Sequence, residues 1–453
     1  MERHRIVLFI FGVMALLAVL CSFFPADGMQ VGKAKLHFPS IREVIGDAKQ
    51  EEILSPEEVI AQREEAVKTA RKGKLEKYLM TDPARFFMPG DDLTYFDPFF
   101  KALDNAGSQQ VRIVHYGDSQ LEEDRITSAI RDRLQAEFGG GGVGLLPAKG
   151  YFTLREGLAA SEELEEFMAF GDPSLRAGTN RYGPRAQMSR LNGTVTFTPY
   201  PIKTNTGAAR CFNRLTVYAG SINGSLHASV KGQKQEAAGG QDLSRLSFQL
   251  PDSTVKASVT ISGSADLYGI SIDNDCGVCV DNIPMRGCSG TIFTSLNSNQ
   301  LASYFKSSGT RMIILQYGGN TVPYTKTEDA INRYCESIRK QIELLKKAAP
   351  GAVILFIGPS DMSTSIAGKR QTYPILPQYI EALKATVTSC GAAYWDLYSV
   401  MGGKDSMVQW VNASPALAGP DYIHFTPKGS EKVGSMFSDA LMLFYDYYKM
   451  RRK

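Results

Sequence analysis

Three side chains in this sequence have the chemistry needed to attack and cleave an acyl bond. Ser119 stands in Gly-Asp-Ser, and Asp421 and His424 form Asp-x-x-His much later in the chain. A serine hydroxyl is a weak nucleophile until a base takes its proton, and histidine titrates near neutral pH. An aspartate can orient the imidazole and stabilise its charged form. We therefore predict Ser119 as a nucleophile, with His424 and Asp421 as its base system.

Two further loops contain groups that could stabilise the negative charge of such a reaction. Acyl transfer passes through a tetrahedral oxyanion, which needs hydrogen-bond donors already in place. The predicted donors are the backbone N–H groups of Ser119 and Gly290 and the side-chain amide of Asn320. Gly290 ends Gly-Cys-Ser-Gly and Asn320 ends Gly-Gly-Asn, although the second motif is also common in plain turns. Gly287 is an alternative to Gly290.

The sequence predicts neither a metal site nor a nucleotide cofactor. The run Asp-Asn-Asp-Cys-Gly at 273–277 starts like a calcium loop, but Pro284 stands where the closing carboxylate belongs. Cys276-x-x-Cys279 has no second ligand pair for zinc. No Gly-x-Gly-x-x-Gly opens a helix. Of the other histidines, His115 lies inside a predicted strand, where we expect it to be a packed core residue.

The elements that must position the candidate residues alternate between strands and helices. Strands are predicted at 111–116, 277–283, 312–316, 352–357 and 392–397, and helices at 121–138, 328–347, 378–389 and 427–449. Such alternation is typical of an α/β fold with a doubly wound parallel sheet. Reactive residues of these sheets gather at the carboxyl ends of the strands, where the candidate loops are expected.

A β-rich segment interrupts this α/β pattern. Between about 150 and 280, short alternating runs rich in Val, Thr, Tyr and Phe are separated by Gly, Asn, Ser and Asp. Several short strands at such spacing predict a β-sandwich or jelly roll. We therefore expect residues 107–150 and 280–453 to form one α/β domain, with residues 151–279 inserted into it as a β domain.

The N-terminal part predicts export from the cytoplasm. Residues 6–24 are apolar except for Ser22, and Arg3 and Arg5 precede them. Residues 1–28 are therefore expected to be a signal peptide or a transmembrane anchor, with the rest of the chain outside the cytoplasm. Residues 29–106 are expected to be a linker with a helical stalk, because 56–79 is charged and helix-forming with little apolar stripe.

The overall composition excludes some classes of partner. The chain has 453 residues with 50 basic and 47 acidic side chains, a net charge of +3. This balance provides no general field for nucleic acid, so no nucleic-acid partner is predicted. Six of the seven cysteines follow residue 28. They are too scattered for a disulfide framework, so most are expected to be small buried side chains.

The four loops resemble the conserved blocks of the SGNH/GDSL hydrolase superfamily. Ser119, Gly290 and Asn320 match its first three blocks, and Asp421 with His424 matches its last block. The resemblance implies a flavodoxin-like three-layer sandwich and an oxyanion hole made by Ser119, Gly290 and Asn320. Gln120 stands where the family name has leucine, and Thr291 follows Gly290 where Asp is usual.

The long β-rich insertion between the first two blocks is similar to that of bacterial peptidoglycan O-acetylesterases, where it resembles a carbohydrate-binding module. This similarity implies a periplasmic or otherwise extracytoplasmic serine esterase that removes acetyl groups from peptidoglycan or another polysaccharide. An O-acetyltransferase would use the same residues and would be expected to work with a membrane protein that exports acyl groups. A noncatalytic envelope carbohydrate-binding protein is the alternative from a different class. A lipase acting on long acyl chains is less favoured, because the insert suits sugars.

Overall fold

The computed structural model describes residues 54–71, 75–82, 85–153, 155–200, 203–204, 207 and 210–452, with 9, 12–13, 15–17, 19, 29–31 and 34–36 before them. The chain divides into two units, Met1–Ser55 and Pro56–Lys453. In the first unit, β1 (Met29–Val31) pairs antiparallel with β2 (Ala34–Leu36). The predicted apolar segment 6–24 lies largely outside the described residues. No helix within the described ranges combines the length and the apolar character needed to cross a bilayer.

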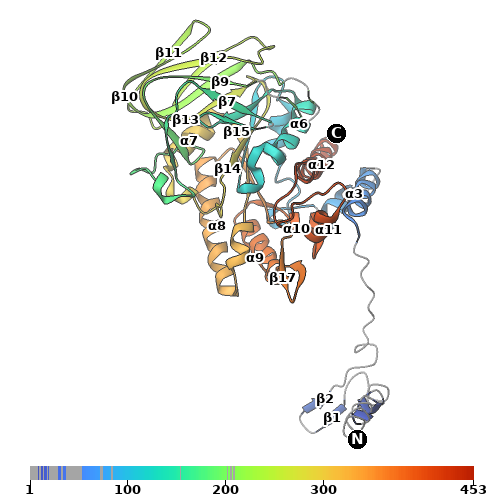
Figure 1. The fold of residues 1–453 in the computed structure, drawn as a ribbon. Coiled ribbons are helices and arrows are strands. Elements are labelled where there is room, and N and C mark those ends of the chain that lie inside the picture. Colours follow the sequence, from blue (N-terminus) through green and yellow to red (C-terminus); the bar gives the residue numbers. More distant parts are fainter. Residues whose placement is uncertain are drawn as a thin grey trace. The chain divides into compact units, whose positions relative to one another are not determined.

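A parallel sheet forms the centre of the second unit (Figure 1). Five of its described strands are parallel, in the spatial order β14, β4, β15, β16 and β19, and β3 pairs antiparallel with β19 at the edge. Numbered along the chain, the parallel strands run 2-1-3-4-5, the order of flavodoxin-like doubly wound sheets. The predicted α/β fold with a parallel sheet is confirmed. The bounds are Gly277–Pro284 (β14), Gln110–Gly117 (β4), Thr310–Gln316 (β15), Val353–Ile357 (β16), Ala393–Trp395 (β19) and Phe86–Phe87 (β3).

Helices cover both faces of this sheet. Alternate residues of β4 point to opposite faces, so Val111 and Ile113 join one core cluster and Val114 and Tyr116 join another. This burial on both faces explains why the parallel strands are almost continuously apolar. The first cluster is covered by α5 (Asp97–Asp104), α6 (Arg125–Phe138) and α12 (Pro427–Arg451), and the second by α7 (Ser298–Ser307), α8 (Glu328–Ala348) and α9 (Leu376–Ser389).

The predicted β-rich insertion forms an antiparallel sheet of nine described strands. The long strands β10, β13 and β9 lie side by side and enclose a separate apolar core. Its assignment as a β-sandwich or jelly roll and the exact domain limits remain predictions. One strand of this sheet, β5, precedes residue 150 and pairs with β13. The strands are Gly142–Leu146 (β5), Tyr151–Phe152 (β6), Gly157–Ala160 (β7), Glu165–Met168 (β8), Gln187–Pro199 (β9), Arg214–Val230 (β10), Gln233–Ala238 (β11), Ser244–Gln249 (β12) and Val259–Asp273 (β13).

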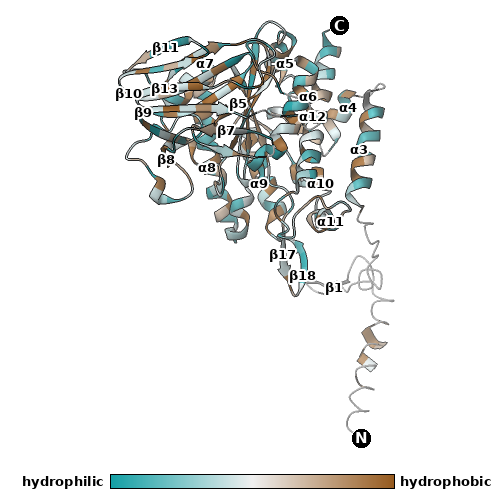
Figure 2. Cartoon of the chain, turned by 45° about the horizontal axis from the view of Figure 1, so that its top comes forward, coloured by the Kyte–Doolittle hydropathy of each residue, from teal (hydrophilic) through white to brown (hydrophobic). Residues whose placement is uncertain are grey.

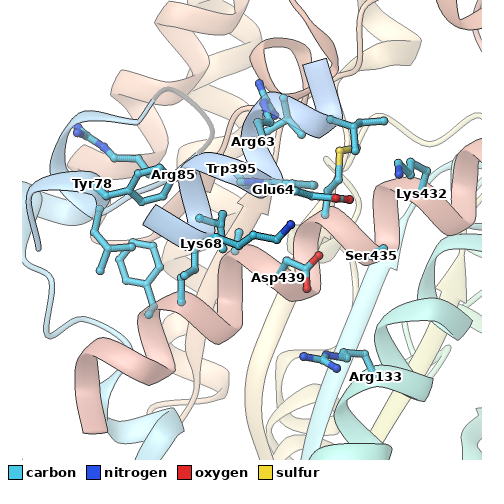
Figure 3. A pocket seen from close by; sticks show the side chains of 18 residues that line it. Arg63, Glu64, Lys68, Tyr78, Arg85, Arg133, Trp395, Lys432, Ser435 and Asp439 are labelled. Atoms are coloured by element: carbon cyan, nitrogen blue, oxygen red, sulfur yellow. The ribbon is translucent and has the colours of Figure 1, made fainter. Parts of the chain in front are cut away.

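The expected stalk packs against the α/β core, and residues 56–104 supply part of that core. Figure 2 shows apolar as well as polar residues along α3 (Pro56–Arg71), and Ile60 on this helix is buried. The next helix, α4 (Leu75–Thr81), buries Leu75 and Leu79. The few apolar residues of α3 and α4 form no clear pattern in a charged sequence. Their burial is nevertheless enough to pack both helices against the rest of the second unit. A cavity of about 260 Å³ lies between these helices and α12, with Trp395 among its lining residues (Figure 3).

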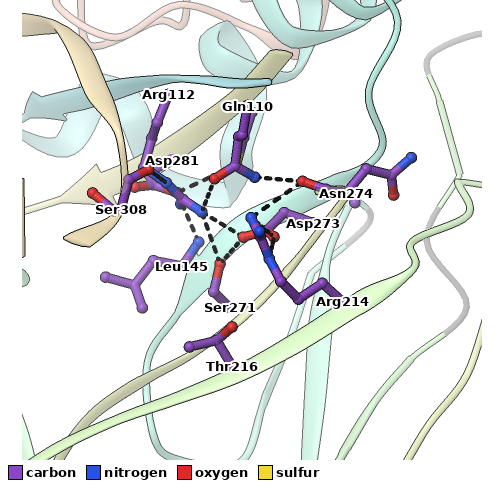
Figure 4. Close-up of polar contacts among 12 residues, drawn as sticks. Gln110, Arg112, Leu145, Arg214, Thr216, Ser271, Asp273, Asn274, Asp281 and Ser308 are labelled. Atoms are coloured by element: carbon purple, nitrogen blue, oxygen red, sulfur yellow. Dashed lines mark hydrogen bonds and ion pairs between the residues drawn. The ribbon is translucent and has the colours of Figure 1, made fainter. Parts of the chain in front are cut away.

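A buried ion-pair network joins the parallel sheet to the antiparallel sheet (Figure 4). Arg112 on β4 pairs with Asp281 on β14 at 2.5 Å and with Asp273 at the end of β13. Arg214 on β10 reaches Asp273 at 2.7 Å. Burial raises the pKa of Asp273, but the two guanidinium groups outweigh this effect and hold the pKa below its ordinary value. The carboxylate considered above as a calcium ligand is therefore bound by arginines.

Replacing Arg112 with leucine should lower the free energy of unfolding by about 3–5 kcal/mol, because two buried carboxylates would lose their shared cation. Urea denaturation monitored by circular dichroism measures the change. Lys149→Leu is the matched control, since its ion pair with Glu166 is 2.6 Å long but 40% exposed on the lysine side. That surface pair should contribute no more than about 1 kcal/mol. Equal losses in the two variants would contradict a special role for the buried network.

The six cysteines after residue 28 are all free, and four of them are buried. The expectation that most are small buried side chains is therefore confirmed. His115 is also fully buried, with its ring nitrogens facing Gln316 at 3.2 Å and Thr127 at 3.0 Å. Burial lowers the pKa of His115 to about 3. This histidine is a neutral core residue, as its place in the strand predicts.

Candidate active site

Ser119 lies at the carboxyl end of β4, where the strand order of the sheet reverses. The strand ends at Gly117, and a 3₁₀ helix (Ser119–Asp124) begins immediately after Asp118. The turn is tight, because a Cβ on Gly117 would lie 2.7 Å from the Leu121 side chain and 3.0 Å from a backbone oxygen of Gln316. The Asp118 carboxylate accepts the Gln120 N–H at 3.0 Å and closes the turn. Ser119 is thus held at the position where doubly wound sheets bind their ligands.

The structure brings Ser119, His424 and Asp421 into one chain of hydrogen bonds. Ser119 Oγ lies 2.7 Å from His424 Nε2, and His424 Nδ1 lies 2.7 Å from Asp421 Oδ2. An ionised carboxylate only accepts hydrogen bonds, so Nδ1 carries the ring proton and Nε2 accepts from the serine hydroxyl. This is the arrangement in which the histidine can take the proton of Ser119.

The Asp421 carboxylate is positioned by backbone hydrogen bonds and accepts a hydrogen bond from the His424 imidazole. Its Oδ1 accepts the backbone N–H groups of Ile423 at 3.0 Å and His424 at 3.1 Å, so the carboxylate also closes its own loop. Partial burial raises the pKa of Asp421, but the hydrogen bonds from the His424 ring and from the two backbone groups outweigh it. The pKa is lowered overall, and the carboxylate therefore stays ionised at the pH values where a histidine acts as a base.

Asn320 approaches the same site from the 3₁₀ helix (Gly319–Tyr324) that follows β15. Its Nδ2 donates to the Cys288 carbonyl at 3.1 Å and to Asp118 Oδ2 at 3.3 Å. Burial raises the pKa of Asp118 to about 6, although the Gln120 N–H and the nearby His424 lower it. The amide thus lies between the Ser119 loop and the Gly-Cys-Ser-Gly loop, and it lines the cavity that contains Ser119 and His424.

Gly290 occupies a position that only glycine fits. Its φ is +80°, and a Cβ there would lie 2.6 Å from the Tyr317 ring. The Gly290 N–H donates to Cys288 Sγ at 3.4 Å, a weak acceptor that a charged oxygen would readily displace. The alternative, Gly287, has a φ of +73° and no neighbour within 4 Å of an added Cβ. Close packing therefore favours Gly290 over Gly287 as the constrained glycine of this loop.

Two residues without a predicted role hold the serine and histidine loops together. Gln120, which stands where the family name has leucine, donates from Nε2 to the Ile423 carbonyl at 2.8 Å and accepts the Phe425 N–H at 3.3 Å. Arg125 donates to the carbonyls of Ser119 and Phe425, each at 3.3 Å. Each of these two side chains links segments that lie about 300 positions apart in the sequence. A sequence motif could not reveal such a contact.

A cavity of about 220 Å³ opens beside the serine and histidine. Its walls combine a few polar groups with apolar side chains, as ligand pockets usually do. Sequence analysis predicts Ser119, Asn320 and His424 and misses the rest, because the lining residues come from five separate segments of the chain. The apolar and aromatic side chains among its lining residues are Tyr317, Pro323, Tyr324, Pro359, Met362, Leu397 and Ile423.

Comparisons with known proteins agree with this architecture. Residues 268–432 match the GDSL-like Lipase/Acylhydrolase family, a segment that includes Gly290, Asn320, Asp421 and His424. Ser119 lies before the matched segment. No curated protein matches the chain in sequence.

Among solved structures, one described as "Peptidoglycan O-acetylesterase in action, 5 min" superposes with a TM-score of 0.63 at 21% identity. The match covers 77% of this chain and 96% of that one, and at this identity the likeness concerns the fold. A family 2 carbohydrate esterase with a carbohydrate-binding domain from Corynascus thermopiles (Myceliophthora fergusii) matches at 12% identity over 62% and 99% of the two chains. Its TM-score of 0.29 is too low to inform this chain.

Four observations point to the same family resemblance. The parallel sheet has the order of a flavodoxin-like fold, and the serine, histidine and aspartate meet at its switch point. The family match covers the segment with the remaining blocks, and the peptidoglycan O-acetylesterase shares the fold. The chain therefore resembles the SGNH/GDSL hydrolases in its fold and, over residues 268–432, in its sequence.

Proposed function

We propose that this protein is a serine esterase that removes acetyl groups from a carbohydrate of the cell envelope, such as peptidoglycan or another polysaccharide. The observation that carries the proposal is the continuous hydrogen-bonded chain from Ser119 through His424 to Asp421, with 2.7 Å at each step. An ester is the expected substrate, because this arrangement supplies an activated hydroxyl and a proton carrier without any cofactor.

In the first half of the reaction, Ser119 Oγ attacks the acetyl carbonyl carbon while His424 Nε2 takes the hydroxyl proton. The carbonyl oxygen becomes an oxyanion, and Asn320 Nδ2 with the N–H groups of Ser119 and Gly290 would donate to it. The tetrahedral intermediate then expels the sugar oxygen, which takes the proton from Nε2. The sugar leaves with a free hydroxyl, and the acetyl group remains on Ser119.

In the second half, water attacks the acetyl carbonyl and gives its proton to His424 Nε2. The new tetrahedral intermediate expels Ser119 Oγ, which recovers the proton, and acetate leaves. Asp421 stays ionised throughout and balances the charge of the imidazolium in both halves. The hydrogen-bonded chain that the structure contains is therefore present before the first half and is restored after the second.

Two observations support a carbohydrate substrate. The fold is similar to that of a peptidoglycan O-acetylesterase, which acts on an acetylated carbohydrate polymer. The cavity of about 220 Å³ is also larger than the two carbons of an acetyl group require, so part of the alcohol can enter it. The antiparallel sheet between the first two blocks would bind or orient the polymer.

The proposed location is outside the cytoplasm, in the periplasm or an equivalent compartment. The apolar run 6–24 preceded by Arg3 and Arg5 supports export by a signal peptide or a membrane anchor. Fractionation of cells that produce the full chain tests this location. Recovery with the cytoplasmic proteins would contradict it.

Replacing Asn320 with alanine should lower kcat for ester hydrolysis by about 10²- to 10³-fold, because one oxyanion donor would be lost. KM should change much less, since the amide acts mainly on charge that develops in the transition state. Steady-state kinetics on 4-nitrophenyl acetate measures both values. Asn105→Ala is the control, because Asn105 is exposed and its side-chain amide donates to the Lys101 carbonyl on the preceding helix. A change confined to KM would contradict the oxyanion role.

The substrate class is tested by measuring acetate released by the full chain from O-acetylated peptidoglycan, acetylated xylan and 4-nitrophenyl acetate. Turnover on one polymer that disappears in Ser119→Ala would support the proposed esterase and identify its substrate. The same residues would serve an O-acetyltransferase, in which a sugar hydroxyl replaces water in the second half. A serine-dependent burst that stalls until a sugar acceptor is added would indicate that activity. Absence of any serine-dependent reaction would instead indicate a carbohydrate-binding protein.

A further inference from the structure

Tyr324 is an aromatic side chain that the fold leaves almost entirely exposed beside the catalytic serine. Its exposed fraction is 83%, the highest among the large apolar and aromatic side chains in the described part of the chain. It nevertheless lines the same cavity as Ser119 and His424. Burial of an aromatic ring usually stabilises the folded protein, so a ring that stays exposed contributes little to folding. An exposed aromatic at the opening of a site is more useful for binding a ligand.

The backbone that carries Tyr324 is held firmly although its ring is free. The residue ends the 3₁₀ helix Gly319–Tyr324, which contains Asn320 and Pro323. Thr321 Oγ1 donates to the Gly318 carbonyl at 2.9 Å and lies 2.5 Å from the buried Tyr379 hydroxyl. The side chain of Val322 is fully buried. A rigid support of this kind reduces the entropy lost when the ring orders against a ligand.

The position of Tyr324 relative to Asn320 indicates which part of a substrate it would meet. Both residues belong to one short helix, and Asn320 is the predicted donor to the carbonyl oxygen of the ester. With the acetyl carbonyl between Ser119 and Asn320, the alcohol occupies the rest of the cavity, which Tyr324 also lines. Its first ring then meets the exposed tyrosine.

We propose that Tyr324 is the platform on which the sugar ring that bears the acetyl ester stacks, so that the substrate is an O-acetylated pyranoside. A pyranose has a face of C–H groups, which suits the electron-rich face of an aromatic ring, and hydroxyls at its edge. This inference rests on the proposed esterase function and specifies its substrate class. Tyr324 is a specificity residue, because it touches the alcohol and not the reacting carbonyl.

The experiment compares Tyr324→Ala, Tyr324→Phe and Tyr324→Trp in the full chain on two substrates, an O-acetylated polysaccharide and 4-nitrophenyl acetate. The measured quantity is the ratio of kcat/KM for the polysaccharide to kcat/KM for the small ester. Tyr324→Ala should lower this ratio roughly 10-fold or more, as expected when a ring loses an aromatic stacking partner. Tyr324→Phe and Tyr324→Trp should restore most of it, because each keeps an aromatic face.

The other outcomes each decide the question. An unchanged ratio in Tyr324→Ala, or a ratio that phenylalanine and tryptophan do not restore, would overturn the stacking role. If the ratio is unchanged because both substrates lose activity equally, the variant has damaged the helix that carries Asn320. Failure of the proposed function is recognised separately in the wild-type chain. If that chain hydrolyses the small ester but no carbohydrate ester, the substrate class is wrong, and the Tyr324 proposal falls with it.

Discussion

Replacing Ser119 with alanine should lower kcat for ester hydrolysis by roughly 10⁴- to 10⁶-fold. The Ser119 hydroxyl is hydrogen-bonded to His424 Nε2, and both residues line the same cavity. Without the hydroxyl no acetyl-enzyme can form, and only the binding site and oxyanion donors remain to assist attack by water. Kinetics on 4-nitrophenyl acetate measures the loss, and mass spectrometry of the wild-type chain should detect an acetylated peptide containing Ser119 at early times.

A second variant separates a shared mechanism from independent effects. His424→Ala should cost about as much as Ser119→Ala, and the double variant should lose little more, because residues that act as one unit are strongly non-additive. Ser435→Ala is the matched control, since Ser435 lies on α12, lines the cavity beside Trp395 and should leave activity unchanged when replaced. Losses that multiply in the double variant would show that serine and histidine do not form one catalytic unit.

The sequence predicts the parts of this fold that depend on local pattern. Parallel strands buried on both faces appear as nearly continuous apolar runs, and the loops after them carry the motif residues. The sheet order then brings Ser119 and His424 within 2.7 Å, although 305 residues separate them. The resemblance to the SGNH/GDSL family and the parallel sheet can therefore both be predicted from one sequence. The catalytic roles of the residues remain predictions that the experiments above test.

Other features depend on contacts that leave no local pattern. Gln120 bridges to the backbone around Ile423, and neither residue type predicts that partner. The helices α3 and α4 pack through only a few apolar residues, so their charged sequence suggests a solvated stalk. The residues that line the cavity come from separate segments of the chain. A binding role for Tyr324 can be inferred only once its exposure and its place in the same cavity as Ser119 are known. Such features need tertiary structure, because their partners are distant in the chain.

Replacing Asp421 with asparagine should lower kcat by about 10³- to 10⁴-fold, because an amide would stabilise the wrong imidazole tautomer. The asparagine oxygen can still accept the N–H groups of Ile423 and His424, so the loop should keep its shape. Its NH₂ group would then face Nδ1 and donate to it, which leaves the ring proton on Nε2. A protonated Nε2 cannot accept the proton of Ser119.

Asp421→Ala distinguishes this tautomer effect from simple loss of the loop. Alanine removes both backbone hydrogen bonds, so it should lower the melting temperature as well as kcat, whereas asparagine should lower kcat with little change in melting temperature. The Asp421 side chain is 48% exposed, so water can partly replace its contact with the ring in the alanine variant. We therefore expect alanine to retain at least as much activity as asparagine per folded molecule. An asparagine variant with more than about one tenth of wild-type activity would be inconsistent with Asp421 as the group that orients the base.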